Sequence, residues 1–202
     1  RVLLGENKVC GLTRPQDAAA AYEAGAIYGG LIFVESSPRN VSESQARDVI
    51  AAAPLQYVGV FRNAAIEKVA ATAGALSLAA VQLHGSEDQD YINALRAVLE
   101  PQVQIWKALS VAEILPPRTL QHIDKYVLDN GQGGTGQRFD WSLLDGEKLD
   151  NVLLAGGLSP DNCVEAAKAG CAGLDFNSGV ESQPGIKDAS KLASVFKTLR
   201  AY

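Results

Sequence analysis

The chain has 202 residues, of which 47% are apolar and 20% are charged. This length and composition fit a single domain, residues 1–202, with a substantial hydrophobic core. The net charge is −5 and lysine or arginine runs are lacking, so binding to nucleic acid or to a membrane surface is not indicated. No apolar run approaches the roughly 18 residues that a membrane-spanning helix needs.

Cysteine and histidine usage limits the chemistry further. The three cysteines, at positions 10, 163 and 171, form no CxxC motif, and the chain has only two histidines, His84 and His122. We therefore expect no disulfide framework and no metal centre. There is no signal-peptide pattern, so a reducing cytoplasm is the expected location. The chain starts at Arg1 and contains no methionine, which favours either a trimmed chain or a domain cut from a longer polypeptide.

Short apolar runs rich in Val, Ile, Leu or Tyr recur along the chain, and each is followed by a polar or glycine break. They predict eight strands near residues 8–10, 29–34, 57–61, 79–83, 104–108, 126–128, 152–154 and 173–176.

Helix-start signals lie between these runs. Pro15 begins one helical stretch, and Ser42 with Gln45 has the spacing of a capping box. Pro160 is expected at a first helical position, and Asp188 opens the last helix. One face of that last helix is apolar, through Leu192, Val195, Phe196 and Leu199.

Strands that alternate with helices predict a parallel sheet with right-handed crossovers. Eight units of about 25 residues each predict a small (β/α)8 TIM barrel with its active site at the C-terminal ends of the strands. Residues 21–33 and 166–176 repeat one pattern, a helix, then Gly25 or Gly170 as a left-handed cap, then a strand. Common descent and a shared loop solution explain this repeat equally well.

Polar side chains stand where predicted strands end, namely Cys10, Arg39, His84, Asp129 and Asp175. Carboxyl ends of parallel strands meet at one edge, so we expect these groups to line one site. Judged from the residues alone, Cys10 fits an inert buried thiol better than a base, which needs a lowered pKa. Arg39 fits a solvated loop and a carboxylate grip equally. His84 is expected to line the site.

Two glycine-bearing loops follow the predicted strands seven and eight. They carry Gly156 and Gly157 in the first loop and Asn177, Ser178 and Gly179 in the second. Backbone N–H groups in such loops bind phosphate in many barrels, so we expect a phosphate site here rather than two empty turns.

The run Gly131-x-Gly133-x-x-Gly136 matches a dinucleotide-binding fingerprint, but no helix clearly follows it. We interpret it as a mobile loop over the site. Trp106 and Trp141 are expected to be packing residues.

Taken together, these motifs resemble the phosphoribosylanthranilate isomerase family from about residue 6 to the end of the chain. The segments that carry the resemblance are 8–13, 37–39, 58–61, 81–85, 128–129, 133–136, 139–141, 155–158 and 174–181. Residues 1–5 also resemble the bifunctional enterobacterial enzymes, in which such an isomerase is fused behind indole-glycerol-phosphate synthase.

The resemblance implies an Amadori rearrangement of N-(5-phosphoribosyl)anthranilate in tryptophan biosynthesis, without a metal or cofactor. It implies Cys10 as general base, against the inert interpretation, Asp129 as general acid, and Arg39 as partner of the anthranilate carboxylate. We expect His84 and Asp175 to contact the substrate. The alternatives are a related histidine-pathway phosphosugar isomerase, disfavoured by Cys10, and a non-catalytic phosphosugar-binding partner domain.

Overall fold

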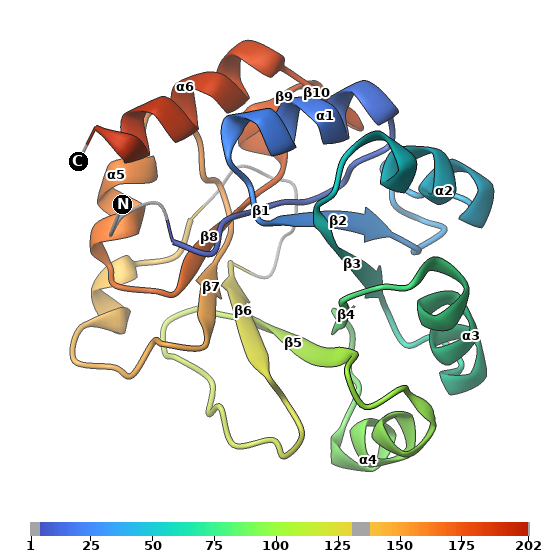
Figure 1. Cartoon of the computed structure of the whole chain (residues 1–202). Coiled ribbons are helices and arrows are strands. Elements are labelled where there is room, and N and C mark those ends of the chain that lie inside the picture. Colours follow the sequence, from blue (N-terminus) through green and yellow to red (C-terminus); the bar gives the residue numbers. More distant parts are fainter. Residues whose placement is uncertain (1–4, 131–137, 202) are drawn as a thin grey trace.

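The computed structural model describes residues 5–130 and 138–201. Eight parallel strands form a closed barrel, and β1 pairs with both β2 and β8 to complete the ring (Figure 1). The predicted barrel is confirmed, and each predicted strand lies within two residues of an observed one. The strands are β1 Lys8–Val9, β2 Tyr28–Ile32, β3 Gln56–Phe61, β4 Ala80–Leu83, β5 Gln104–Ser110, β6 Lys125–Asp129, β7 Val152–Leu154 and β8 Gly173–Phe176.

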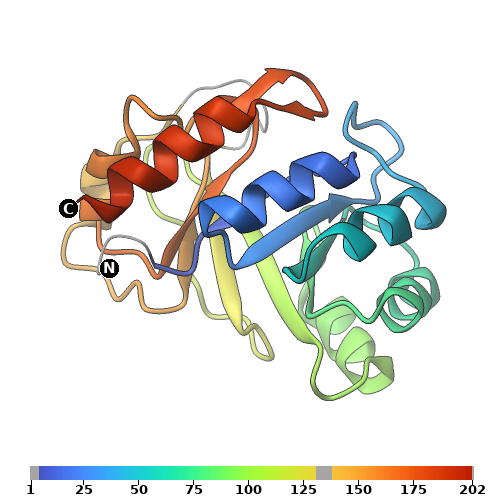
Figure 2. The ribbon, with the colours of Figure 1, turned by 45° about the horizontal axis from the view of Figure 1, so that its top comes forward.

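Helices surround the barrel, and α6, α1 and α2 lie side by side on its outside (Figure 2). The α-helices of the described residues are α1 Pro15–Ala24, α2 Glu43–Ala52, α3 Ile66–Leu76, α4 Gln89–Val98, α5 Cys163–Lys168 and α6 Ala189–Arg200. None of the helices in this part of the chain is long and apolar enough to cross a membrane.

The barrel departs from regular alternation after β5. Residues 111–124 form no α-helix. Pro116 and Pro117 stand in this segment, and adjacent prolines remove backbone donors and disfavour helical geometry before them. A short 3-10 helix, η1 (Trp141–Leu144), precedes β7.

Three of the predicted helix starts are confirmed. Pro15 is the first residue of α1. The Ser42 side chain accepts from the Gln45 N–H while the Gln45 side chain accepts from the Ser42 N–H, which completes the capping box. Asp188 caps α6, and the predicted apolar face of that helix is buried.

The predicted start at Pro160 is wrong, because α5 begins at Cys163. Asn162 has a non-helical φ of −129° and caps a turn instead of continuing a helix. Its side chain accepts from the Ser159 N–H at 2.9 Å and donates to the Gly157 carbonyl at 2.8 Å. These bonds fix residues 157–162 as a turn that supports the loop after β7. Gly25 and Gly170 both have the positive φ that the repeat predicted, +115° and +89°.

An antiparallel hairpin, absent from the sequence prediction, follows the short 3-10 helix η2 (Ser178–Val180). Its strands are β9 (Glu181–Gln183) and β10 (Ile186–Lys187). Gly185 in the connecting turn has φ +83°. The Pro184-Gly185 dipeptide is a turn signal that predicts such a hairpin in retrospect.

Both tryptophans are packing residues, as predicted. Trp106 is fully buried inside the barrel and meets Tyr28 edge-on, with ring centroids 4.9 Å apart. Trp141 is buried beneath the Arg138 guanidinium, which lies 4.5 Å from its ring centroid. His122 is exposed, at positive φ, away from the site.

Candidate active site

A cavity of about 290 Å³ opens among the residues that follow the barrel strands. It receives side chains or backbone from β1, β2, β3, β4, β6, β7 and β8 or from the loops after them. All ten site residues predicted from the sequence line this cavity: Cys10, Arg39, His84, Asp129, Gly156, Gly157, Asp175, Asn177, Ser178 and Gly179.

Cys10 lies directly after β1 and is buried. Its N–H donates to the Phe176 carbonyl at 2.8 Å, which continues the β1–β8 pairing to the rim of the barrel. Gly30 on β2 makes room for the thiol, because a Cβ at that position would stand 2.6 Å from Sγ of Cys10.

Lys8 lies beneath Cys10 and was missed by the sequence interpretation. It is fully buried, and its Nζ donates to Asp175 Oδ2 and to Gln82 Oε1, each at 2.9 Å. Burial on its own lowers the pKa of Lys8, but the charges of Asp175 and Cys10 outweigh it and raise the pKa. The available signal was its position two residues before Cys10, because alternate residues of a strand share a face.

The pKa of Cys10 is raised, whereas a base at this position needs a lowered one. Burial raises the pKa of the thiol, and Asp175 adds to the rise, while Lys8 and Lys187 oppose it. The net pKa lies above the ordinary value of a thiol.

Asp129 ends β6 and is buried, with Oδ2 3.4 Å from Nε2 of His84. The other ring nitrogen of His84 lies 3.5 Å from Nε2 of Gln82. Lys8, Gln82, His84 and Asp129 therefore form a continuous polar row from the barrel interior to the cavity. Only β7 and β8 separate β6 from β1, so Asp129 and Cys10 face one cavity from separate strands.

Arg39 reaches the cavity from the loop after β2 and is buried, which excludes the solvated interpretation. Its guanidinium already has a protein partner, because Nε and Nη2 donate to the carboxylate of Glu181 at 2.9 and 2.6 Å. The sequence interpretation missed Glu181 and its second cation, Lys187, 3.1 Å away.

The two glycine-bearing loops touch one another. A side chain at Gly179 would collide with the carbonyl oxygen of Leu158, so glycine is required for this approach. Gly156 and Gly157 both have positive φ, +93° and +69°. The predicted phosphate site is thus a pair of tightly packed backbone loops on one side of the cavity.

The glycine run with Gly131, Gly133 and Gly136 lies outside the described residues, and with it the expectation of a loop over the site. Within the described part of the chain, no group of three or more His, Cys, Asp or Glu side chains is arranged to hold a metal ion.

Comparisons with curated proteins point to one family. The model of the family described as N-(5′-phosphoribosyl)anthranilate (PRA) isomerase matches residues 7–198. The tryptophan biosynthesis protein TrpCF of Salmonella typhi is 75% identical over 202 residues, which cover 100% of this chain and 45% of that protein. TrpCF of Yersinia pestis is 70% identical over 202 residues, 100% of this chain and 42% of that protein. The chain thus spans less than half the length of these relatives.

Solved structures agree over the full barrel. Phosphoribosyl anthranilate isomerase from Thermus thermophilus superposes with a TM-score of 0.87 and 30% identity, covering 97% of this chain and 98% of that one. A phosphoribosyl anthranilate isomerase in complex with reduced 1-(o-carboxyphenylamino)-1-deoxyribulose 5-phosphate superposes with a TM-score of 0.81 and 30% identity. The match covers 98% of this chain and 100% of that one. The chain therefore belongs to the N-(5′-phosphoribosyl)anthranilate isomerase family.

Proposed function

We propose that this chain converts N-(5-phosphoribosyl)anthranilate to 1-(2-carboxyphenylamino)-1-deoxyribulose 5-phosphate, a step of tryptophan biosynthesis. The observation that carries the proposal is one cavity lined by Cys10, Asp129, Arg39 and both glycine-bearing loops. Its membership of the isomerase family, and the reduced product bound by a relative of the same fold, support this substrate.

The substrate has an anion at each end, and the cavity offers a partner for both. The loops with Gly157 and Gly179 suit the phosphate, because backbone N–H groups approach an anion closely where no side chain intervenes. Arg39 suits the anthranilate carboxylate, because a guanidinium forks to two oxygens at once. Between these ends the ribose lies beside Cys10 and Asp129.

Ring opening comes first in the proposed mechanism. Asp129 in its protonated form gives a proton to the furanose oxygen, and the anthranilate nitrogen lone pair forms the C=N bond as the C1–O bond breaks. The products of this step are an open-chain iminium and an Asp129 carboxylate. His84, with Nε2 3.4 Å from Oδ2 of Asp129, holds the carboxyl group in place during this step.

Proton removal follows. The iminium acidifies the neighbouring C2–H, and Cys10 takes that proton, which leaves an enolamine that tautomerises to the ketone. The raised pKa of the Cys10 thiol opposes this step in the empty site. The cationic iminium and Lys8 supply positive charge beside the sulfur, so the Cys10 thiol loses its proton to solvent in the cavity when the intermediate has formed, and the resulting thiolate accepts the C2 proton.

Asp175 is the proposed partner of the sugar hydroxyls. Its Oδ2 is held by Lys8, while its Oδ1 is buried and has no hydrogen-bond partner among the described residues. A buried carboxylate oxygen without a donor is costly, and a substrate hydroxyl in the cavity satisfies it.

A fused indole-glycerol-phosphate synthase stays a prediction. It is supported by the name TrpCF of the relatives and by the 45% of the Salmonella typhi protein that this chain covers. The cytoplasmic location also stays a prediction.

The test of the proposed function is direct. Freshly prepared phosphoribosylanthranilate is fluorescent, and the chain should remove that fluorescence with time. Asp129→Asn should abolish turnover, because an amide cannot donate the proton, yet still bind the reduced product. Asp150→Asn, an exposed carboxylate in a loose 3.9 Å pair with Lys148, is the matched control and should act like the parent. Activity of Asp129→Asn within about tenfold of the parent would remove the acid role.

A further inference from the structure

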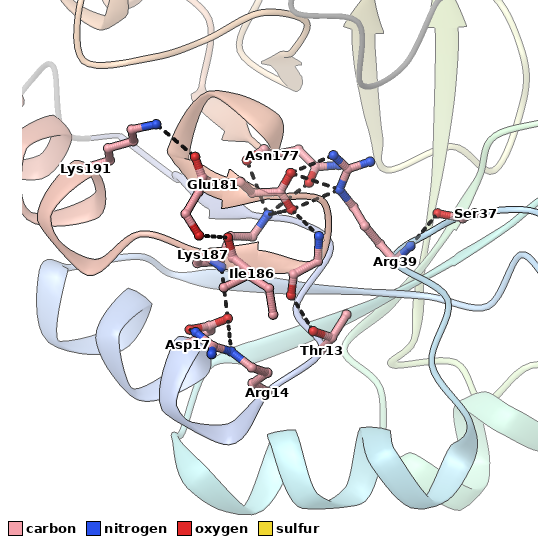
Figure 3. Close-up of polar contacts among 12 residues, drawn as sticks. Thr13, Arg14, Asp17, Ser37, Arg39, Asn177, Glu181, Ile186, Lys187 and Lys191 are labelled. Carbon is pink, nitrogen blue, oxygen red and sulfur yellow. Dashed lines mark hydrogen bonds and ion pairs between the residues drawn. The ribbon is translucent and has the colours of Figure 1, made fainter.

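Glu181 is buried, contacts the cavity-lining Arg39, and accepts from four donor groups of three residues (Figure 3). Arg39 donates from Nε at 2.9 Å and from Nη2 at 2.6 Å. Lys187 Nζ lies 3.1 Å from Oε2, and the Gly185 N–H donates to Oε2 at 3.0 Å. A carboxylate with this many fixed donors has little freedom to turn.

The ion pair uses one particular edge of the guanidinium. Glu181 occupies the edge formed by Nε and Nη2, so the plane of the Arg39 fork is fixed and the Nη1 side is presented elsewhere. No hydrogen bond to Nη1 occurs among the described residues, and Arg39 itself lines the cavity. Glu181 therefore holds the Nε and Nη2 edge of Arg39, while the Nη1 donors remain for the carboxylate of a substrate.

The hairpin that carries Glu181 is itself anchored to the barrel. Lys187 donates from Nζ to Oδ1 of Asn177 at 2.9 Å and from its backbone N–H to the buried carboxylate of Asp17 at 3.0 Å. Lys191 on α6 donates to the Glu181 carbonyl at 2.8 Å. Figure 3 shows these contacts converging on the hairpin from α1, α6 and the loop after β8.

We propose that Glu181 is a positioning residue for the isomerase reaction: it aims Arg39 at the substrate carboxylate without touching the substrate. The inference rests on the proposed role of Arg39 as the carboxylate partner. It assigns the β9–β10 hairpin a function in substrate recognition, through a residue that does not line the cavity.

If net charge alone mattered, removing the negative charge of Glu181 would strengthen carboxylate binding, whereas loss of Arg39 alignment would weaken it. Arg39, Lys187 and Glu181 sum to +1, which suits a single carboxylate. In Glu181→Gln the sum becomes +2, or stays at +1 if Lys187 gives up its proton, since burial already lowers the pKa of Lys187. The positive charge never falls, so weaker carboxylate binding in this variant has to come from lost alignment of Arg39.

The experiment compares two ligands on parent and variant proteins. Reduced 1-(o-carboxyphenylamino)-1-deoxyribulose 5-phosphate carries both anions, whereas ribulose 5-phosphate lacks the aryl carboxylate. Glu181→Gln should weaken the first ligand by about tenfold or more, the scale of one charge-assisted hydrogen bond, and the second by less than about threefold. In turnover, KM should rise more than kcat falls. Glu43→Gln, which breaks an exposed 2.8 Å pair with Arg47, should change neither ligand.

A second variant guards against misfolding. Glu181→Asp keeps the charge beside Lys187 but is one methylene shorter, so it cannot keep both contacts to Arg39. Glu181→Asp should show the same selective loss of affinity for the reduced product. It replaces Glu181→Gln in the experiment if that variant does not fold.

Glu181 substitutions combined with Arg39→Ala show whether Glu181 acts through Arg39. If Glu181 acts through Arg39, adding a Glu181 substitution to Arg39→Ala should cost no further affinity for the reduced product. An equal loss in both backgrounds, or equal weakening of both ligands by the Glu181 variants, overturns the positioning role alone. If Arg39→Ala itself fails to discriminate the two ligands, the carboxylate grip and the positioning role fall together.

Discussion

At the scale of single residues, the site combines the Cys10 thiol with the buried cation of Lys8, two residues earlier on the same strand face. Lys8 is fully buried, which is unusual for lysine, and it is neutralised by Asp175 rather than by solvent. The pair holds positive charge under Cys10 but also brings Asp175 close enough to raise the pKa of the thiol. In the proposed mechanism, Cys10 therefore acts as a base only once a cationic intermediate lies beside it.

The three cysteines should differ sharply under substitution. We expect Cys10→Ala to be folded and inactive, because it removes the group that we propose as acceptor of the C2 proton. Cys163 is buried in α5, and Cys171 follows that helix, both away from the cavity. Cys163→Ala and Cys171→Ala should stay active in the fluorescence assay. Equal loss in all three variants would show that packing explains Cys10.

The ionisation of Cys10 can be followed by alkylation. In a protein with Cys163→Ala and Cys171→Ala, iodoacetamide reports the thiolate fraction of Cys10. Because the pKa of Cys10 is raised, its alkylation rate should climb about tenfold per pH unit from pH 7 to 9, with a midpoint above that of glutathione in the same buffer. A midpoint below that of glutathione would contradict the raised pKa.

At the scale of elements, the loop after β4 is fixed by one carboxylate. Glu87 accepts from the Asn63 N–H at the end of β3, from the Gly85 N–H after β4, and from Lys107 Nζ on β5 at 2.9 Å. Burial alone raises the pKa of Glu87, but these donors outweigh it and lower the pKa. This network holds the segment that presents His84 to the cavity.

Glu87→Gln should destabilise the protein by about 3–5 kcal/mol at pH 7, because it leaves the charge of Lys107 buried without its partner. Because the pKa of Glu87 is lower in the folded protein than in the unfolded chain, its ionised form stabilises the fold at pH values above the unfolded pKa. The stability difference between parent and Glu87→Gln should therefore shrink as the pH falls below about 4. Urea unfolding of both proteins across pH measures it. Glu43→Gln, in an exposed pair, should cost about 1 kcal/mol or less. A gap that persists unchanged at pH 3 would refute the ionic origin.

The loop after β7 offers a matched pair of glycine substitutions. Gly157 and Gly146 have similar positive φ, +69° and +77°, and Gly146 has open space around it. Valine strains the backbone at either position. Only Gly157→Val should weaken both the reduced product and ribulose 5-phosphate, by about tenfold or more, since both use the phosphate loops. Equal effects on binding in the two variants, measured by titration, would mean that strain alone is responsible.

At the scale of the whole molecule, the barrel and the location of the site follow from local signals. Apolar runs with breaks place the eight strands, and polar residues after them converge because the strands are parallel and closed. Lys8 and Glu181 were not predicted, because their roles depend on partners 167 and 142 positions away along the chain, and Lys187 was missed with the hairpin that carries it. Nothing local tells a solvated lysine from one that faces an aspartate across the barrel. The predicted start of α5 was wrong because the Asn162 side chain bonds to the Gly157 carbonyl, and this contact keeps residues 157–162 in a turn.

The closure of the ring has a consequence for synthesis on the ribosome. Lys8 is paired with a carboxylate 167 positions later, and Arg39 with one 142 positions later. β1 gains its second neighbour only when β8 has been made. A nascent chain that has not reached β8 therefore holds an open sheet edge and a Lys8 without its carboxylate, and Arg39 lacks its partner until residue 181 has been added. The partners that fix Lys8 and Arg39 both lie within residues 175–181, so a chain that stops before β8 should leave both cations without them.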